Sequence, residues 1–301
     1  MSRSQDHPSY RAGKSGSGVE TGVGWPHRHY ALTDSTNARA KELAANGAPH
    51  GTVVTADEQT AGRGRQGRVW VAPPGRALLY SLLLRPLGDR PLLPLVVALA
   101  VCEAAEGLVA SSGEVKSGGA MAPQGEAGKG AAPPRCLVKW PNDVLLEGRK
   151  LAGALIEARR APQRPTSPLD RPGDGEVEED WAVIGVGLNL TIEPEEFPPE
   201  LRDRATSLAV ATSLEPGETR SPGNGWRTRC TTLLSAALER WVDAEDEATL
   251  AAWSERDALE GRRVAWDGGS GIAGGVDGRG NLVVATPSGP VTLNAGEVHL
   301  R

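Results

Sequence analysis

Residues 139–157 read KWPNDVLLEGRKLAGALIE, in which the polar pair Glu147–Gly148 separates two apolar stretches. A glycine-containing turn between two such stretches is typical of a β-hairpin. We therefore predict two strands, one over LVKWPNDVLL (137–146) and one over KLAGALIEARR (150–160). The polar residues of this segment then lie at or near the ends of the strands.

Four of those polar or small residues are candidates for ligand binding. Pro141 has no N–H to donate to a sheet ladder, so Asn142 and Asp143 should project from a strand end. Lys150 opens the second strand, and Gly153 leaves space for a ligand beside it. The alternative is an ordinary turn, in which Asn142 and Asp143 bond only to the local backbone.

Upstream, residues 58–70 read EQTAGRGRQGRVW, in which three glycines alternate with Arg63, Arg65 and Arg68. Glycines let a backbone pass close to a ligand, and guanidinium groups bind phosphate or carboxylate bidentately. The segment is neither a Walker P-loop nor a Rossmann glycine motif. A ligand-binding loop is therefore expected, with a surface turn or a disordered RNA-binding segment as alternatives. RNA-binding segments of this type repeat, whereas this one occurs once.

The rest of the sequence predicts further strands, helices and a small C-terminal barrel. Residues 185–190, GVGLNL, place two glycines in an apolar strand, which often marks close approach of a ligand or another backbone. Short apolar runs after Leu259, separated by glycine-rich turns, predict a small barrel. Helices are predicted over 34–47, 92–109 and 226–257, and strands over 51–56 and 76–84.

Three stretches lack the periodicity of a packed element. Residues 1–28 are polar and are expected to form a disordered leader, and residues 111–135 and 162–179 are expected to be flexible inserts. The expected organisation is thus a leader, a catalytic domain over 29–258 and a C-terminal barrel over 259–301.

Composition narrows the function classes. The 301-residue chain has a formal net charge of −5, which does not favour binding to nucleic acid or to anionic membranes. Its three cysteines have no CxxC spacing, so neither a disulfide framework nor a zinc site is expected. The apolar stretch 92–110 is interrupted by Pro94, Glu103 and Glu106, so it is not expected to span a membrane. Without a signal peptide, a cytoplasmic location is predicted.

Lysine is rare in this sequence. Only six of the 33 basic residues are lysines, and Lys139 and Lys150 lie eleven residues apart in structured sequence. A lysine in an arginine-rich chain is a candidate for a role that needs a compact ammonium group.

The order and spacing of DSTN (34–37), GRGRQGR with Trp70, KWPND, RKLAG and GxGLN resemble the biotin protein ligases. The resemblance covers about residues 29–301. It implies an α/β (α+β) fold, with a mixed-sheet catalytic domain of the biotin/lipoate ligase type and a C-terminal SH3-like β-barrel. It also implies ATP-dependent biotinylation of a lysine on the biotin carboxyl carrier domain of acetyl-CoA carboxylase or a related carboxylase. Biotin and ATP are then the substrates, with Mg²⁺, and biotinyl-5′-AMP is the intermediate.

The resemblance also implies roles for individual residues. The catalytic residues are Lys150, Arg65 and Asp143, of which Lys150 bridges the biotin carboxylate and the ATP α-phosphate. Asp143 is either an outer Mg²⁺ ligand or the residue that orients the incoming amine, and no other metal ligand is assigned. The residues implied for biotin are Ser35, Thr36, Asn37, Gln59, Gly62, Arg63, Gly64, Arg65, Lys150, Gly153 and Gly187. Those implied for ATP are Arg65, Arg68, Trp70, Lys139, Asn142, Lys150 and Asn189.

The start of the chain departs from the two-function members of that family. No winged helix fits residues 1–28, so DNA binding is not expected, and the protein is expected to be a monomer or weak homodimer. A lipoate–protein ligase is the alternative enzyme, against which the GRGRQGR and KWPND segments argue. A non-catalytic biotin sensor is the alternative outside enzymes, and the presence of Lys150 argues against it.

Overall fold

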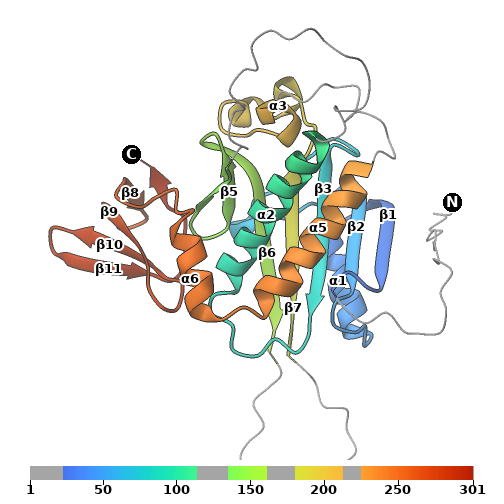
Figure 1. Ribbon diagram of the computed structural model, residues 1–301, viewed down its shortest axis with the longest axis horizontal. Coiled ribbons are helices and arrows are strands. Elements are labelled where there is room, and N and C mark those ends of the chain that lie inside the picture. Colours follow the sequence, from blue (N-terminus) through green and yellow to red (C-terminus); the bar gives the residue numbers. More distant parts are fainter. Residues whose placement is uncertain (1–22, 114–134, 161–179, 213–224, 301) are drawn as a thin grey trace, which may run out of the picture.

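The computed structural model of this protein describes residues 23–113, 135–160, 180–212 and 225–300 (Figure 1). The inserts 114–134 and 161–179 and the leader up to residue 22 lie outside the described residues. The helices are α1 (Thr36–Ala45), α2 (Leu93–Gly113), α3 (Leu208–Thr212), α5 (Gly225–Val242) and α6 (Asp246–Ser254). The short 3-10 helices are η1 (Arg65–Gly67), η3 (Pro194–Glu196) and η4 (Pro199–Leu201).

The central sheet has seven strands in the order β1-β2-β3-β7-β6-β5-β4. Among the described strands, β1 and β2 pair in parallel and every other neighbouring pair of this sheet is antiparallel. This mixed sheet, with helices on both faces, confirms the predicted fold class. The strands are β1 (His27–Thr33), β2 (Val53–Gln59), β3 (Ala77–Leu84), β4 (Leu137–Lys139), β5 (Asp143–Leu146), β6 (Arg149–Arg159) and β7 (Trp181–Asn189).

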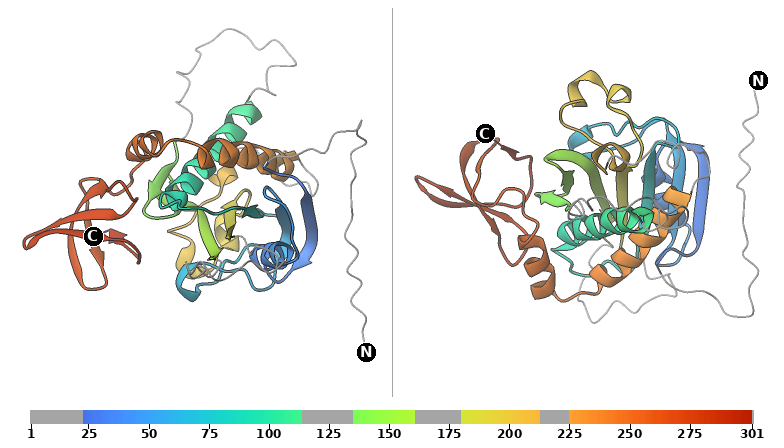
Figure 2. Two further views of the ribbon diagram at one scale, coloured as in Figure 1. Left: turned by 90° about the horizontal axis from the view of Figure 1, so that it is seen from below. Right: turned by 45° about the horizontal axis from the view of Figure 1, so that its top comes forward.

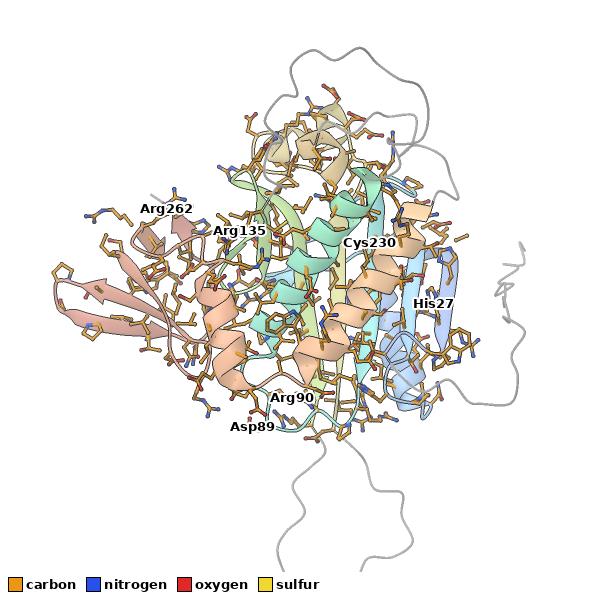
Figure 3. The ribbon with its side chains drawn as sticks, viewed as in Figure 1. His27, Asp89, Arg90, Arg135, Cys230 and Arg262 are labelled. Carbon is orange, nitrogen blue, oxygen red and sulfur yellow. The ribbon has the colours of Figure 1, made fainter. Side chains whose placement is uncertain are left out.

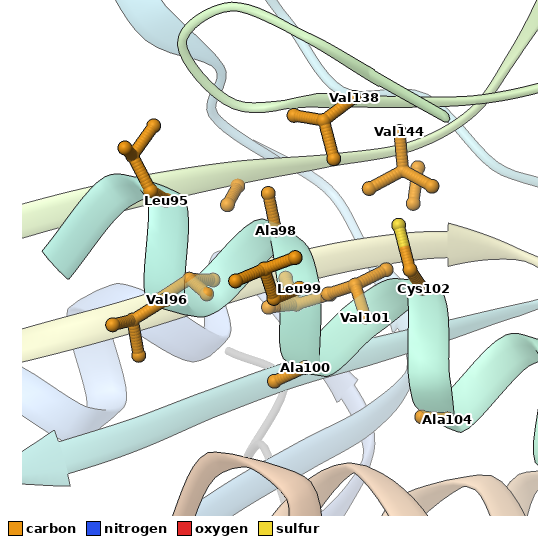
Figure 4. Close-up of a cluster of buried hydrophobic side chains, with 14 of the residues drawn as sticks. Leu95, Val96, Ala98, Leu99, Ala100, Val101, Cys102, Ala104, Val138 and Val144 are labelled. Carbon is orange, nitrogen blue, oxygen red and sulfur yellow. The ribbon is translucent and has the colours of Figure 1, made fainter. Parts of the chain in front are cut away.

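Helices α2 and α5 cover one face of this sheet and build the main core (Figures 1 and 2). In Figure 4, Ala98 and Cys102 of α2 point toward Val138 and Val144 of β4 and β5. Helix α1 packs on the opposite face, where its alanines contact Val54, Leu83 and Val183. Because side chains alternate along a strand, the two faces of the same strands carry different residues.

Helix α2 is long and apolar enough to cross a membrane, but 67% of its most apolar window is buried inside the protein. Such burial is typical of a core helix. Pro94, Glu103 and Glu106 interrupt the apolar stretch but not the helix, which was predicted over 92–109 and runs through all three positions. Proline is tolerated in the first turn, where its missing N–H has no helical partner. Glu103 forms an ion pair with Arg240, and Glu106 forms one with Arg256.

The C-terminal unit is a five-stranded antiparallel sheet in the order β11-β10-β9-β8-β12. In the described part of the chain, no pairing joins β11 to β12, so the sheet is open where the prediction has a barrel. The Trp140 indole Nε1 donates to the Gly280 carbonyl at 2.9 Å and so ties this sheet to the central domain. The strands are β8 (Arg263–Trp266), β9 (Gly269–Val276), β10 (Leu282–Thr286), β11 (Gly289–Leu293) and β12 (His299–Leu300).

Two predicted boundaries at the ends of segments are wrong. The leader does not extend to residue 28, because His27 begins β1 at the edge of the sheet and pairs with Val53 (Figure 3). The insert predicted from residue 111 begins later, since α2 continues to Gly113. In both cases polar residues join an element because a neighbouring ladder or helix satisfies their backbone groups.

Two predicted elements are each divided. The strand predicted over 137–146 is two strands, β4 and β5, which turn at Trp140–Asn142 and pair with each other. The helix predicted over 226–257 ends at Val242, and α6 starts after an extended Glu245 with Asp246 and Glu247 in its first turn. Acidic residues stabilise a helix N-terminus, so this charge pattern favours a new helix.

The junction between the two sheets contains Asp257, whose Oδ2 atom is buried with no hydrogen-bond partner among the described residues. Its Oδ1 atom accepts from the Leu259 N–H at 2.7 Å. Burial, supported by the charge of Glu260, raises the pKa of Asp257 to about 6. The folded state therefore binds this proton more tightly than the unfolded state does, and stability falls as pH rises from about 4 to 6.

Asp257→Asn should consequently stabilise the protein above pH 7 and not at pH 4. The amide keeps the acceptor for Leu259 and removes the charge, and we expect about 1–2 kcal/mol after allowance for partial solvent exposure. Urea unfolding at pH 4 and pH 7.5 measures the difference, with the exposed Asp267→Asn as control. An equal effect of Asp257→Asn at both pH values would contradict the burial argument.

Candidate active site

The floor of the candidate site is the face of the central sheet that carries α1. Two rows of paired residues cross it: Ser81, Gly185 and Leu155 form one row, and Leu79, Gly187 and Gly153 form the other. Because four of these six side chains are small or absent, the sheet is hollowed there. The hollow is a cavity of about 910 Å³.

Two floor glycines are required by close contacts. A Cβ on Gly185 would lie 2.1 Å from the Asn37 Oδ1 atom, and one on Gly187 would lie 2.4 Å from the Trp70 ring. Both distances are far below van der Waals contact. The glycines therefore let an amide from α1 and an indole from the Gly/Arg loop lie flat on the sheet.

The structure brings nearly all sequence-predicted site residues to this cavity. The exception is Gly62, which lies at the base of the loop, where a Cβ would meet the Trp70 carbonyl oxygen at 2.4 Å. The residues that line the cavity are Ser35, Thr36, Asn37, Gln59, Arg63, Gly64, Arg65, Arg68, Trp70, Lys139, Asn142, Asp143, Lys150, Gly153, Gly187 and Asn189.

The Gly/Arg loop, residues 62–70, folds back on itself. The Trp70 N–H donates to the Gly62 carbonyl at 3.0 Å, and the Gly64 N–H donates to the Arg68 carbonyl at 2.7 Å. Gln66 and Gly67 at its tip have φ values of 55° and 74°. The positive φ suits glycine at Gly67, whereas Gln66 is a non-glycine residue in the left-handed region.

One end of the cavity is polar, and the side chains of Ser35, Thr36, Asn37 and Gln59 that line it are uncharged. The Gln59 Oε1 atom accepts from the Thr36 N–H at 2.7 Å, so Gln59 caps α1, while no capping bond from the Ser35 side chain is found in the described structure. The Ser81 hydroxyl contacts Thr36 Oγ1 at 2.8 Å and Asn37 Oδ1 at 2.6 Å. These groups form a wall of hydrogen-bond donors and acceptors.

The other end is cationic. Lys150 Nζ lies 2.6 Å from Asp143 Oδ1 and 5.9 Å from the centre of the Trp70 ring. Its backbone is held on both sides, because its N–H donates to the Arg204 carbonyl and its carbonyl accepts from the Thr206 N–H. Asn189 supports this contact by donating its amide to the Thr206 carbonyl at 3.0 Å. The backbone of Lys150 is thus held in place, while its ammonium group reaches the cavity.

Further cations surround this end. The Arg65 guanidinium donates to Asn142 Oδ1 at 2.9 Å, and Arg68 pairs with Glu297 of the C-terminal sheet. Burial lowers the pKa of Lys139, although Asp143 and Glu297 counteract part of this shift. The four cations Lys139, Lys150, Arg65 and Arg68 outnumber the two carboxylates Asp143 and Glu297 around this end, and such an excess of positive charge favours anionic groups. Within the described ranges, no group of three or more His, Cys, Asp or Glu residues is placed to hold a metal ion.

Trp70 separates the polar and cationic ends. Its indole Nε1 is buried and has no hydrogen-bond partner in the described part of the chain. The ring packs on the floor at Gly187 and faces Lys150. The cavity therefore offers a hydrogen-bonding pocket, a narrow glycine floor, an aromatic plane and a cluster of cations in one continuous space.

Comparisons with known proteins identify the family. The biotin/lipoate A/B protein ligase family matches residues 30–166, and the biotin protein ligase C terminal domain matches residues 267–301. A biotin--[acetyl-CoA-carboxylase] ligase of Mycobacterium tuberculosis is 33% identical over 296 residues, covering 94% of this chain and 92% of that protein. The chain belongs to the biotin protein ligase family.

Two further similarities support the biotin protein ligase assignment. The bifunctional ligase/repressor BirA of Bacillus subtilis is 37% identical over 198 residues, covering 64% of this chain. The match spans about half (50%) of that relative. The solved biotin protein ligase of Aquifex aeolicus in complex with biotin and ATP is 25% identical, with a TM-score of 0.63 over 91% of this chain and 98% of that one. The likeness in fold therefore includes the C-terminal sheet.

Sequence reasoning missed three residues that shape this biotin protein ligase site. Gly185 belongs to the quoted GVGLNL stretch, but only Gly187 is in the predicted set. Ser81 is a hydroxyl inside an otherwise apolar strand, which is a readable signal for a polar contact. Glu297 reaches the site from the C-terminal sheet and carries no local signal of that contact.

Proposed function

We propose that the protein uses ATP to attach biotin to one lysine of a biotin carboxyl carrier domain of acetyl-CoA carboxylase or a related carboxylase. The observation that carries the proposal is the pairing of an uncharged hydrogen-bonding wall with a cationic end in one cavity. Biotin has a neutral ureido ring and a carboxylate at opposite ends, and ATP adds further anionic groups. The protein would act in the cytoplasm, as a monomer or weak homodimer, without a DNA or membrane partner.

The polar wall favours biotin over lipoate. The ureido ring of biotin has two N–H donors and a carbonyl acceptor, which Ser35, Thr36, Asn37 and Gln59 can pair. The dithiolane ring of lipoate has no such groups and would leave the remaining hydrogen-bonding capacity of this wall, such as the Gln59 amide N–H groups, without a ligand partner. A site built for hydrogen bonds rejects a ligand that lacks them, because each unpaired buried group is costly.

The first chemical step joins the two substrates at the cationic end. A carboxylate oxygen of biotin attacks the α-phosphorus of ATP, pyrophosphate leaves, and the product is the mixed anhydride biotinyl-5′-AMP. Lys150 can neutralise the negative charge that develops between the carboxylate and the α-phosphate. Arg65, Arg68, Lys139 and Asn142 would bind the nucleotide, with its planar base beside Trp70.

ATP enters with Mg²⁺ as a substrate complex. Asp143 is a carboxylate at the cationic end, and one carboxylate suits a Mg²⁺ ion whose remaining ligands are phosphate oxygens and water. Asp143 also bonds Lys150, so it can hold the ammonium in place until the substrates arrive. In the second step the carrier lysine attacks the acyl carbon, AMP leaves, and an amide forms.

Arg65→Gly should weaken retention of biotinyl-5′-AMP more than it slows its formation. The guanidinium lies in the loop over the cavity, and charge-assisted hydrogen bonds of about 1.5–3 kcal/mol each correspond to roughly ten- to a hundred-fold in dissociation. Released intermediate should then label bystander lysines. A trapping assay measures its lifetime, and an unchanged lifetime with no added labelling would argue against this role.

The proposed function is tested by pyrophosphate exchange. Radiolabelled pyrophosphate should enter ATP only when biotin is present, because reversal of adenylation requires the bound acyl group. Exchange that depends on lipoate instead of biotin would favour the lipoate ligase. Biotin binding without any exchange would favour a non-catalytic sensor.

A further inference from the structure

Glu157 lies behind the polar wall and contacts three separate segments of the chain. Its carboxylate lies 2.8 Å from Lys41 Nζ, 2.9 Å from Asn37 Nδ2 and 3.2 Å from an Arg63 guanidinium nitrogen. Its side chain is 25% exposed, and it does not line the cavity itself. The residue belongs to β6, the strand that also carries Lys150.

The carboxylate determines which way the Asn37 amide points. Asn37 is 4% exposed, and its Nδ2 atom donates to Glu157 and to the Leu155 carbonyl. Its Oδ1 atom accepts from the Ser81 hydroxyl. In the reversed orientation, Oδ1 would face the carboxylate and the Leu155 carbonyl, so three acceptors would meet without a donor.

The orientation of the Asn37 amide determines where the Ser81 hydroxyl proton goes, and so affects the hydrogen-bonding groups of the cavity wall. The Thr36 hydroxyl donates to Gln59 Oε1 at 3.1 Å, so the single proton of Ser81 goes either to Thr36 Oγ1 at 2.8 Å or to Asn37 Oδ1 at 2.6 Å. In the observed orientation of Asn37, its Oδ1 atom can take the Ser81 proton. The lone pairs of Thr36 are then available on the cavity side. A reversed Asn37 would send the Ser81 proton to Thr36 and change the pattern of donors and acceptors in the wall.

Glu157 keeps its charge in this position. Burial alone would raise its pKa, but hydrogen bonds from Lys41 and Asn37 and the positive charge of Arg63 lower the pKa below its ordinary value. Arg63 also extends the network to the Gly/Arg loop, so a single carboxylate joins α1, β6 and that loop.

We propose that Glu157 is a positioning residue that sets the hydrogen-bond polarity of the wall formed by Thr36, Asn37 and Ser81. It thereby selects a neutral ligand ring that carries N–H donors beside a carbonyl. The inference rests on the proposed function, because it takes the biotin ring as the occupant of this end. Glu157 has no contact with the reacting atoms at the Lys150 end, so its role concerns binding and not the chemical step.

The test compares biotin binding and turnover in Glu157→Gln. The substitution keeps the size of the side chain and removes its charge and one acceptor. We expect about ten-fold weaker biotin binding by calorimetry without ATP, and a KM for biotin raised by about the same factor, with kcat within about two-fold. Glu103→Gln is the matched control, since Glu103 of α2 pairs with Arg240 of α5 at the other face of the sheet and its substitution should leave both constants unchanged.

The outcomes separate this proposal from the proposed function. If the wild-type protein does not bind biotin, the proposed function is wrong. Wild-type protein that binds biotin while folded Glu157→Gln binds it equally well would overturn the role of Glu157 alone, as would a loss in kcat at unchanged KM. If Glu157→Gln does not fold, Lys41→Gln is the second variant. It removes the hydrogen bond from Lys41 to the Glu157 carboxylate, and Lys41 is the more exposed of the two residues. About three-fold weaker biotin binding is then expected, and unchanged binding would overturn the proposal.

Discussion

Lys150→Ala is expected to slow formation of biotinyl-5′-AMP by about 10²–10³-fold, comparable to the loss of one oxyanion-hole donor. The ammonium group lies at the cationic end with its backbone fixed by the Arg204 and Thr206 contacts. Its charge is needed most when negative charge grows on the α-phosphate, so the loss should fall on the chemical step and less on ATP binding. Rapid-quench measurement of adenylation before the first turnover tests this expectation.

Lys139→Ala is the comparison variant for this prediction. Lys139 is half-buried at the end of β4 and is assigned to nucleotide binding, so its loss should mainly raise the KM for ATP. Lys150→Arg should not restore adenylation, because a planar guanidinium cannot replace a compact ammonium between two closely placed anions. Equal losses at both positions, or near-normal adenylation by Lys150→Ala, would overturn the assignment.

Gly185→Ala should weaken biotin binding by more than about a hundred-fold. The added methyl group would lie 2.1 Å from Asn37 Oδ1, and Asn37 cannot move away without breaking its bonds to Ser81 and Glu157. Overpacking of a rigid site costs about 1–3 kcal/mol, and broken buried hydrogen bonds add to that cost. Calorimetric titration with biotin measures the effect.

Gly107→Ala is the matched control for this glycine. Gly107 lies within α2, where an added Cβ would meet Leu233 at an ordinary distance of 3.7 Å. Alanine in a helix interior is favoured over glycine by about 1 kcal/mol, so the control should keep or gain stability and bind biotin normally. Normal biotin affinity in Gly185→Ala would show that the ring does not occupy the Asn37 end of the cavity.

The parts of the fold that could be predicted from sequence are those with local signals. The turn at Glu147–Gly148, the helix after Ser35 and the strand over 181–189 each have their own turn, cap or apolar pattern. The candidate site was predictable because its residues belong to short motifs whose glycines and charges have chemical meaning on their own. The structure adds that these motifs meet on one face of one sheet.

The parts that could not be predicted depend on contacts between distant segments. Strand β1 has polar residues and forms because β2 offers a free edge to pair with. Glu157 looks like an ordinary strand residue until Lys41, Asn37 and Arg63 are placed around it. Likewise, the contact of Arg68 with Glu297 joins residues from two different sheets. No local pattern encodes such pairs.

Biotin transfer by this protein can be measured as a change in the mass of the carrier protein. The full chain is incubated with biotin, MgATP and a purified biotin carboxyl carrier domain, with Lys150→Ala as the negative control. We expect one biotinyl group on one lysine of the carrier with the wild-type chain and almost none with Lys150→Ala in the same time. A carrier that gains no biotinyl group with the wild-type chain, or gains a lipoyl group instead when lipoate is supplied, would contradict this expectation.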